Sequence, residues 1–390
     1  MNYPWSKTVF PIAIIFAFRM WGLFLLIPVF SVYALSLEDA TPILIGFALG
    51  IYGLSQGIMQ IPFGLLSDKL GRKPVLVAGL LLFAGGSLLG AFTHSIYGMI
   101  IARTLQGTGA IGSVLIALLA DLTPDEERTK AMAVIGITIG LSFSSAMIFS
   151  PFLAQHYGLK GIFLLTSLLA LTALVLLYSV IPTPKTQPVH CESEAQPALL
   201  SSVLKNKQLL RLDLGIFCQH YILTATFFVT PFILKSQILM GALQGQWQFY
   251  LPLMLFAFLF MVPMIIIAEK RGHMKKVFLG SVLTTILAQW ALISLHLHWW
   301  FFCTIFLAYF TSFNILEATL PSMISKQAPS QSKGTAMGVY STSQFLGLFA
   351  GGALAGVIYN SYNIPGVFLF NGIVGFIWLI IALPMRLEKK

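Results

Sequence analysis

The sequence is poor in charge. Asp, Glu, Lys and Arg make up only 9% of its 390 residues, whereas hydrophobic residues make up 57% and the mean hydropathy is +0.86. Soluble globular domains carry about 25% charged residues. The composition therefore excludes an ordinary soluble protein and places the chain in a lipid bilayer.

Residues that carry chemistry are scarce as well. The three cysteines are odd in number and unevenly spaced, which indicates neither a disulfide framework nor a metal site. No Gly-Lys-Ser/Thr phosphate loop is present, so ATP hydrolysis by that route is excluded. His296 and His298 are too few, and too close to a membrane surface, for the catalytic cluster of a membrane-embedded enzyme. We expect no cofactor, no metal and no enzymatic activity.

Twelve apolar runs are long enough to span a membrane as helices of about 20 residues. The expected spans are 8–34, 42–66, 74–92, 95–120, 129–154, 160–181, 208–234, 246–268, 276–294, 299–322, 333–358 and 364–384. The stretch between the sixth and seventh spans is polar and rich in proline. We predict an N-terminal six-helix bundle over 1–181, a cytoplasmic linker over 182–207 with an amphipathic turn near 201–205, and a C-terminal six-helix bundle over 208–390.

The basic residues set the orientation of these spans. If both termini are placed in the cytoplasm, nearly all Lys and Arg fall in cytoplasmic segments. The exceptions are Lys160 and Lys235, which lie on the outer side, and Arg19 and Arg103, which lie within spans. Cytoplasmic loops carry such an excess. The net charge of +10 therefore orients helices and does not indicate a nucleic-acid partner. The apolar run after Lys7 is too long for a signal-peptide core, and we expect it to remain as the first helix.

The loop between the second and third spans has the most informative spacing. It reads Gly64-Leu65-Leu66-Ser67-Asp68-Lys69-Leu70-Gly71-Arg72-Lys73, with an aspartate four residues after one glycine and three before another. The attraction of bases to a cytoplasmic loop does not specify that aspartate. The loop resembles the signature between the second and third helices of the major facilitator superfamily, which comprises secondary transporters.

Other runs extend the resemblance over essentially the whole chain. Residues 50–54, 61–68 and 333–347 look like those of the YajR-type inner-membrane transporters of this superfamily. The resemblance implies an all-α integral membrane protein with twelve transmembrane helices in two pseudo-symmetric six-helix bundles. It also implies proton-driven transport across a bacterial inner membrane, with export as the expected direction. Proteins of that type carry a further soluble domain after the twelfth helix, which we expect to be missing because the sequence stops at Lys390.

The resemblance also implies that the loop latches the cytoplasmic side shut. Asp68 is expected to face the start of the eleventh helix near 332–335, where free N–H groups and the helix dipole favour an anion by roughly 0.3 to 1 kcal/mol. Small residues would open the approach, and Arg72 with Asp121 would position Asp68. A merely solvated acid is the alternative for Asp121. The expected latch residues are Gly64, Asp68, Gly71, Arg72, Lys73, Asp121 and Gly334.

The fourth and fifth spans carry two further signatures of unequal quality. The run from Arg103 to Gly109 is similar to the fourth-helix signature of proton-coupled members, in which the arginine is implicated in proton coupling; a structural arginine paired with a helix-end acid is the alternative. The fifth-helix signature of antiporters is poorly kept, since Ser150-Pro151 stands where Gly-Pro is expected. The run from Gly107 to Gly112 matches a dinucleotide pattern, but we expect it inside an apolar helix, where glycines allow close packing.

Three ionisable residues lie deeper in the spans. Arg19, His220 and Glu317 are each about 9 to 12 residues from the nearest cytoplasmic base, or roughly 13 to 18 Å into the membrane. Polar groups at such depth are functional hypotheses by default. We expect Glu317, His220 and Arg103 to couple protons, with a satisfied core histidine as the alternative for His220. Asp213 lies too near the start of its helix to need a special role.

The first, fourth, seventh and tenth helices line the central cavity in the superfamily. The expected substrate-cavity residues are Arg19, Gln106, Asn314, Tyr340 and Gln344. Because an arginine near the bilayer middle costs at least about 2.5 to 3.5 kcal/mol, Arg19 must have a partner. One possibility is that the partner is Glu317, another cavity acid or an anionic substrate. The other is that backbone carbonyls and side-chain amides satisfy Arg19, which would favour cationic or apolar substrates.

The sequence therefore predicts a proton-coupled secondary transporter that works by alternating access, functions as a monomer and moves a small solute. Its partners would be that solute, protons and the bilayer. Proton symport for uptake of a small nutrient or organic anion is the alternative to export. A channel is less favoured, because it needs rings of like groups around a continuous pore.

Overall fold

The computed structural model describes residues 4–183, 197–329 and 332–385, which form helices and turns without a strand. The helices are α1 Val9–Phe24, α2 Phe30–Tyr33, α3 Pro42–Leu70, α4 Arg72–Phe92, α5 Ile96–Thr108, α6 Gly112–Leu122, α7 Asp125–Ser179, α8 Pro197–Lys205, α9 Lys207–Leu239, α10 Trp247–Lys270, α11 Met274–Leu295, α12 Trp299–Gln327 and α13 Lys333–Ala382. Short 3₁₀ turns, η1 Trp5–Lys7 and η2 Ala34–Ser36, flank the first span. The α8 helix covers the turn predicted near 201–205, whereas 184–196 of the predicted linker lie outside the described residues.

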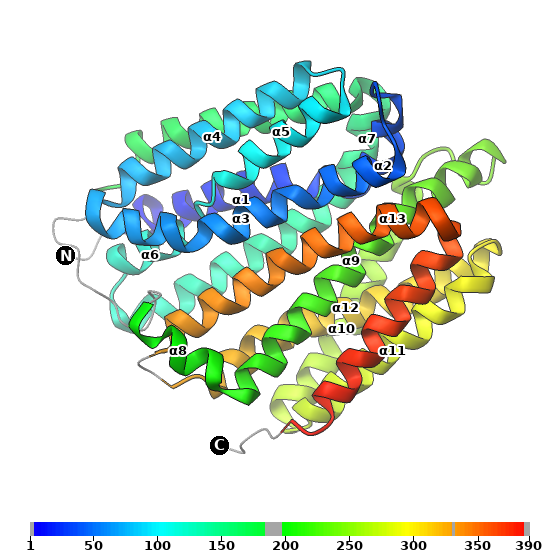
Figure 1. Ribbon diagram of the computed structural model, residues 1–390. Helices are drawn as coiled ribbons and strands as arrows, with labels where there is room; N and C mark the ends of the chain where they lie inside the picture. The colour runs from blue at the N-terminus through cyan, green and yellow to red at the C-terminus, as the bar shows by residue number, and fades with distance from the viewer. Residues whose placement is uncertain (1–3, 184–196, 330–331, 386–390) are drawn as a thin grey trace.

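Two helices are long enough for two spans each. The 55-residue α7 and the 50-residue α13 are kinked at one residue of positive φ, Gly158 (φ 62°, ψ −167°) and Asn363 (φ 55°, ψ −160°). Ten helices of the described chain are long and apolar enough to cross a membrane, and these kinks divide two of them. The predicted fold class is confirmed: twelve spans form two six-helix bundles, one from α1–α7 and one from α9–α13 (Figure 1).

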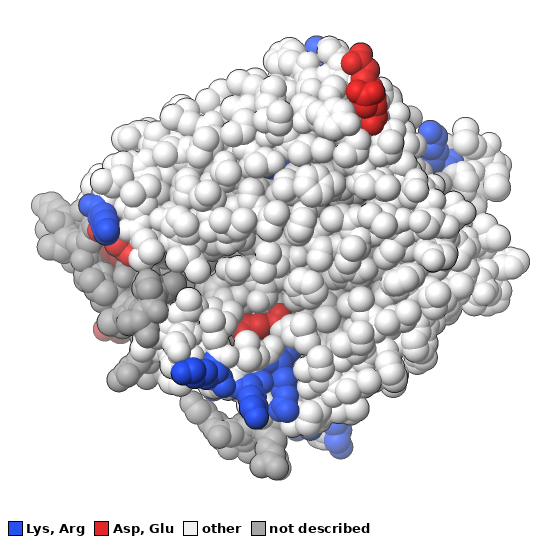
Figure 2. All heavy atoms as spheres, viewed as in Figure 1, with Lys and Arg blue, Asp and Glu red and all other residues white. Residues whose placement is uncertain are grey.

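The outer surface of the bundles is suited to lipid. Leu255, Phe258 and Leu259 on α10 each expose more than 60% of their area. Water would disfavour such a surface, whereas hydrocarbon covers it without cost. Figure 2 shows the same division on one face: Lys and Arg gather at the end of the molecule near α8, and a broad uncharged band separates them from a few charges at the other end.

The two bundles meet where α13 lies between α3 and α9 (Figure 1). The helices approach at glycines: a Cβ added at Gly46 would overlap the Gly352 oxygen, and one at Gly50 would lie 2.5 Å from the Phe349 oxygen. On its other face, α13 places Gly351 against α9, where a Cβ would overlap the Tyr221 oxygen. Since any side chain at these positions would meet backbone, the glycines determine how closely the bundles join.

The contact between α3 and α13 is confined to one end. It is tightest from Pro42 to Gly53 and loosens at Gly57, where a Cβ would lie 3.4 Å from the Phe345 Cβ. Beyond that point a Cβ at Gly64 would meet, within 4 Å, only Ser113 of its own bundle. We call the end with the Gly71 turn between α3 and α4 the loop end, and the end with Pro42 the far end. The halves are joined at the far end and separate toward the loop end.

Two predicted spans differ from the structure. The first is helical only to Phe24 and continues through turns, α2 and η2. The fourth was predicted to run unbroken from 95 to 120, but it is interrupted between Thr108 and Gly112. Here Ala110 N donates to Thr108 O at 2.8 Å, and Ile111 N donates to Gly109 O at 2.8 Å, in place of helical bonds. A Cβ at Gly109 would lie 2.5 Å from the Gly79 oxygen, so the break accompanies close approach of α4.

The glycine contact at the far end predicts an unusual response to alanine. Alanine normally stabilises a helix by roughly 0.5 to 1 kcal/mol relative to glycine. Gly50→Ala should instead lower the free energy of unfolding by about 1 to 3 kcal/mol, because the added methyl group overlaps the α13 backbone. Gly140→Ala is the matched control, since a Cβ there meets nothing within 4 Å. Thermal unfolding of the purified proteins measures both, and equal midpoints would contradict the proposed constraint.

Candidate functional site

A cluster of polar side chains in the C-terminal bundle joins α9, α12 and α13. We call Gln219, His220, Glu317 and Gln344 the carboxylate cluster. Gln219 Nε2 donates to Glu317 Oε2 at 3.0 Å, and His220 Nε2 lies 3.8 Å from the same oxygen. Gln344 Nε2 lies 2.8 Å from His220 Nε2. Three positions predicted separately from the sequence, His220, Glu317 and Gln344, therefore come together.

The hydrogen bonds of His220 define its protonation state in this arrangement. Its Nδ1 lies 3.3 Å from the Ile216 carbonyl oxygen, which only accepts, so Nδ1 carries a proton. Nε2 then accepts from the Gln344 amide, and the ring is neutral. His220 is buried, whereas Glu317 leaves 36% of its side chain exposed, so the carboxylate is the member that solvent reaches.

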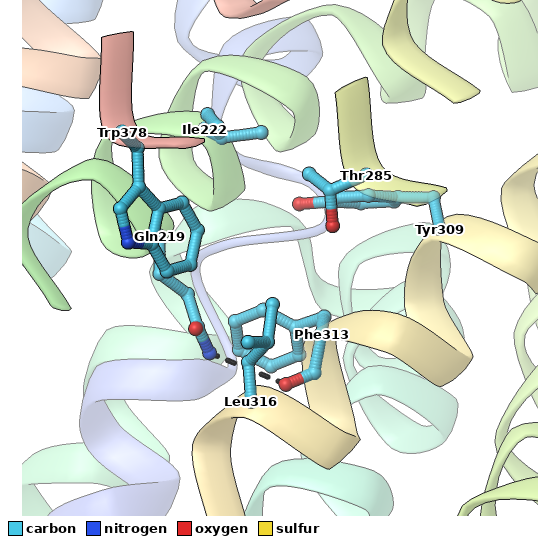
Figure 3. A pocket seen from close by; sticks show the side chains of 7 residues that line it. All are labelled: Gln219, Ile222, Thr285, Tyr309, Phe313, Leu316 and Trp378. Atoms are coloured by element: carbon cyan, nitrogen blue, oxygen red, sulfur yellow. Dashed lines mark hydrogen bonds between the residues drawn. The ribbon is translucent and has the colours of Figure 1, made fainter. Parts of the chain in front are cut away.

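Gln219 connects Glu317 to a narrow pocket inside the C-terminal bundle. Figure 3 shows its amide beside Phe313, to whose carbonyl oxygen Nε2 donates at 3.2 Å. The pocket is lined by Gln219, Ile222, Thr285, Tyr309, Phe313, Leu316 and Trp378. It leaves no room for a water molecule and is part of the packing that fixes Gln219.

Several buried polar atoms in and around the carboxylate cluster, Gln219 Oε1 among them, have no hydrogen-bond partner among the described residues. They include the Tyr340 hydroxyl and both oxygens of the Asp213 carboxylate. Tyr340 lies within electrostatic reach of both Asp213 and Glu317. Asp213 was predicted to need no special role, and the structure adds that its side chain is buried. Its position six residues into α9 masked the burial, since α8 and α13 also pack against that end of α9.

Asn314 was predicted to line the same cavity. It is half-buried on α12, and its Nδ2 donates to the Phe310 carbonyl of its own helix at 2.9 Å. This bond occupies the amide nitrogen and leaves the amide oxygen for other partners. Within the described ranges, no three His, Cys, Asp or Glu side chains gather as metal ligands.

The N-terminal bundle holds two buried arginines with different surroundings. Arg103 Nη1 donates to Gln106 Oε1 at 2.8 Å, and its guanidinium lies 4.6 Å from the centre of the Tyr52 ring. Gln106 Nε2 in turn donates to Ser87 Oγ at 2.8 Å. These partners differ from the helix-end acid considered from sequence. They also place Gln106, which is fully buried, inside the bundle and away from a solvent-lined cavity.

Arg19 lies between α1, α3 and α6. A Cβ added at Gly112 would lie 3.6 Å from Arg19 Nη1 and 3.8 Å from Gln60 Nε2, so these groups are neighbours. The structure does not pair Arg19 with Glu317: no hydrogen bond or ion pair joins them in the described chain, and Glu317 contacts Gln219 and His220 instead. Glu317, one of the partners considered for Arg19 from the sequence, is therefore not its partner in this structure.

The loop-end cluster forms around Arg72. Its Nε donates to Asp121 Oδ2 at 2.9 Å, and its Nη1 donates to Ser67 Oγ at 2.7 Å and to Asp68 Oδ1. Gly71 ends α3 with φ 95°, a conformation that glycine adopts without strain. Arg72, Asp68 and Asp121 are therefore brought together, as expected, and the Asp121 side chain is fully buried, which excludes a merely solvated acid.

The rest of the expected latch is not assembled in this structure. Asp68 is 38% exposed, and its carboxylate bonds to Arg72 and not to the start of α13. No atom of Gly334 lies within 4 Å of a Cβ added at Gly64. Lys73 has a different role: its Nζ donates to the Ile181 oxygen at 2.6 Å and lies 5.6 Å from the centre of the Tyr178 ring, which ties α4 to the end of α7.

Known proteins resemble this chain over its whole length. The family model of the Major Facilitator Superfamily matches residues 12–346 and 214–390. Inner membrane transport protein YajR of Escherichia coli (strain K12) is 43% identical over 95% of this chain and 82% of its own. A transporter of Buchnera aphidicola subsp. Schizaphis graminum (strain Sg) is 34% identical over 98% of this chain and 97% of its own. A solved structure of a mutant of the nucleoside transporter NupG has a TM-score of 0.73 at 16% identity, covering 97% and 98% of the two chains, which concerns the fold alone.

The buried pair at the loop end predicts a stability change. Arg72→Gln should lower the free energy of unfolding by about 3 kcal/mol, because it leaves the fully buried Asp121 carboxylate without its guanidinium partner. Lys69→Gln in the same loop is the control, since Lys69 is exposed and should change stability by less than about 0.5 kcal/mol. Thermal unfolding in detergent compares the two, and similar midpoints would show that the pair contributes little.

Proposed function

This chain belongs to the Major Facilitator Superfamily, and from that premise we propose that it is a proton-coupled secondary transporter that exports a small solute by alternating access. The observation that carries the proposal is Glu317, a partly exposed carboxylate in the middle of α12 that contacts a neutral histidine and an amide. Acids placed within spans are costly and are typical of proton and substrate pathways.

Protonation of Glu317 would change contacts that reach the helix between the two halves. A protonated carboxyl group can donate to His220 Nε2, which now accepts from Gln344 on α13. Gln344 would then lose its acceptor. Because α13 is in backbone contact with both α3 and α9, a change at Gln344 acts on the helix that joins the halves. This sequence of contacts supports coupling between proton binding and conformation.

The α3–α13 contact supports alternating access. The contact between α3 and α13 is tight at the far end and is lost toward the loop end, which supports an arrangement open at the loop end. We propose that the loop end is cytoplasmic, since Lys and Arg gather there (Figure 2), and that the structure faces inward. To reach the opposite state, the two six-helix bundles, 1–181 and 208–390, would rock about the site. Asp68 would then meet the start of α13 and hold the loop end shut.

The membrane and the direction of transport are also part of the proposal. YajR of Escherichia coli is named an inner membrane transport protein, which supports a bacterial inner membrane with both termini in the cytoplasm. We propose export in exchange for protons by a monomer. Uptake by proton symport is the alternative that the poorly kept fifth-helix signature leaves open. In inside-out vesicles, proton-driven accumulation of solute indicates export, whereas accumulation only in right-side-out vesicles would show uptake.

Glu317→Gln tests the proton site. The amide keeps the size of the side chain but cannot exchange a proton, so gradient-driven accumulation should fall to background while solute binding persists. Counterflow in proteoliposomes without a gradient measures the remaining exchange. Thr304→Ala is the control on the same helix, because Thr304 is exposed and its hydroxyl donates only to the Trp300 carbonyl of its own turn. Unchanged accumulation by Glu317→Gln, with loss on His220→Ala, would move the proton site to the histidine.

Asp68→Asn tests the latch. Loss of the charge removes the attraction to the start of α13 in the loop-closed state but leaves the buried Arg72–Asp121 pair in place. Transport should fall at least tenfold, while the amount of folded protein in the membrane stays unchanged. Lys69→Gln, in the same loop, should retain transport. Wild-type transport by Asp68→Asn would contradict a role for this carboxylate in closing the loop end.

A further inference from the structure

Arg19 is buried without the acceptors that a guanidinium needs. It is 3% exposed, and its Nε and Nη2 atoms have no hydrogen-bond partner in the described chain. The neighbouring Gln60 has a buried Oε1 without a partner, and one turn earlier on α3 both polar atoms of the Gln56 side chain are buried and unpartnered. A buried charged donor without an acceptor is strongly unfavourable, and the Arg19 guanidinium has none of the neighbouring amide oxygens as an acceptor in this arrangement.

The other buried arginine is better satisfied by the same bundle, although its Nε also lacks a hydrogen-bond partner in the described chain. Arg103 has the Gln106 oxygen at 2.8 Å and the Tyr52 ring at 4.6 Å from its guanidinium. Gln60 also lies near Arg19, with Gln56 one turn away on α3, yet neither is joined to Arg19 by a hydrogen bond in the described chain. The difference between the two arginines indicates that the site around Arg19 is kept available to an external acceptor.

The charges in the spans are divided between the two halves. The N-terminal bundle places Arg19 and Arg103 within its spans, while its acids, such as Asp68 and Asp121, lie at helix ends. The C-terminal bundle places Asp213 and Glu317 within its spans. A negatively charged acceptor for Arg19 must therefore come from the other half or from a ligand, and Glu317 is engaged by Gln219 at 3.0 Å.

The Arg19 site lies within two helical turns of the carboxylate cluster along the helix axes. Gly53 on α3 meets Phe345 on the antiparallel α13. Gln344, the cluster member on α13, lies one residue before Phe345, whereas Gln56 and Gln60 lie three and seven residues past Gly53. The Arg19 site therefore lies roughly 3 to 9 Å further toward the loop end than the cluster. This is where α3 and α13 separate. In the proposed cycle, a solute that enters from the loop end would pass between Arg19 on one half and Glu317 on the other.

We propose that Arg19, Gln56 and Gln60 form a subsite for the carboxylate of a small organic anion. The proposal rests on the transport function above and names its substrate class. A guanidinium presents two parallel N–H groups that match a carboxylate, and the two amides add donors. One cation among neutral amides balances one negative charge, so a monoanionic carboxylate fits better than a phosphate dianion.

The first test needs no ligand. If Arg19 is an unpaired buried charge in the empty protein, Arg19→Gln removes an unfavourable group and should raise the unfolding midpoint of the purified protein by about 2 to 4 °C. Arg271→Gln, which removes an exposed arginine in the loop between α10 and α11, should leave the midpoint unchanged. An unchanged or lower midpoint for Arg19→Gln would show that Arg19 is satisfied within the fold and would overturn the subsite.

The second test uses acetate, pyruvate, succinate and benzoate, each paired with its amide, and tetraphenylphosphonium as a cation. At least one carboxylate should bind the wild-type protein in calorimetric titration, with affinity about tenfold or more lower in Arg19→Gln and unchanged in Arg271→Gln. Its amide should not bind. Binding of the cation or the amides, equal in wild type and Arg19→Gln, would overturn the subsite.

Vesicle transport separates the subsite from the proposed function. Proton-driven accumulation of a cation or neutral solute that Arg19→Gln leaves unchanged would overturn the subsite and leave proton-coupled transport standing. Carboxylate binding that is lost in Arg19→Gln, without any gradient-driven flux of that carboxylate, would support the subsite and overturn proton-coupled transport.

Discussion

The structure depends on backbone contact between helices of different halves. In a bilayer, helix association gains little from the hydrophobic effect, because lipid tails are as apolar as leucine, and close packing supplies the attraction instead. The glycines of α3 and α13 allow this packing at the far end, and those on the opposite face of α13 allow it against α9. The α13 helix is the main connection between the halves, which α7 also joins through the contacts of Phe143 with Phe310 and Phe313.

The same contact explains why the polar groups are divided as they are. Arg19 and Gln60 belong to one half, and His220, Glu317 and Gln344 belong to the other, on either side of the region where α3 and α13 separate. Within each half the groups are held by rigid helices, through bonds such as Gln219 to Glu317. Movement of one half against the other would change the distance between the two sets without disturbing either.

Much of the fold could be predicted from the sequence, because hydropathy and the spacing of the loop motif are local properties. The apolar runs predicted the spans, and the loop from Gly64 to Lys73 predicted the meeting of Asp68, Arg72 and Asp121. The break at Gly109 was missed, since it depends on α4 approaching that point. The buried state of Asp213 and the partners of Arg103 were missed for the same reason: they are set by helices distant in sequence, and no pattern in the local residues records them.

The kinks in α7 and α13 are built in the same way and restrict which residues can occupy the turn. Tyr157-Gly158-Leu159-Lys160-Gly161-Ile162-Phe163 and Tyr362-Asn363-Ile364-Pro365-Gly366-Val367-Phe368 hold nearly the same backbone angles at their second residue. In both, a Cβ on the later glycine would overlap the Cβ of the tyrosine. The same turn therefore stands at the junction of the last two spans in each half, as an internal structural repeat requires. Its conformation restricts the second position to residues that tolerate positive φ, glycine in one half and asparagine in the other.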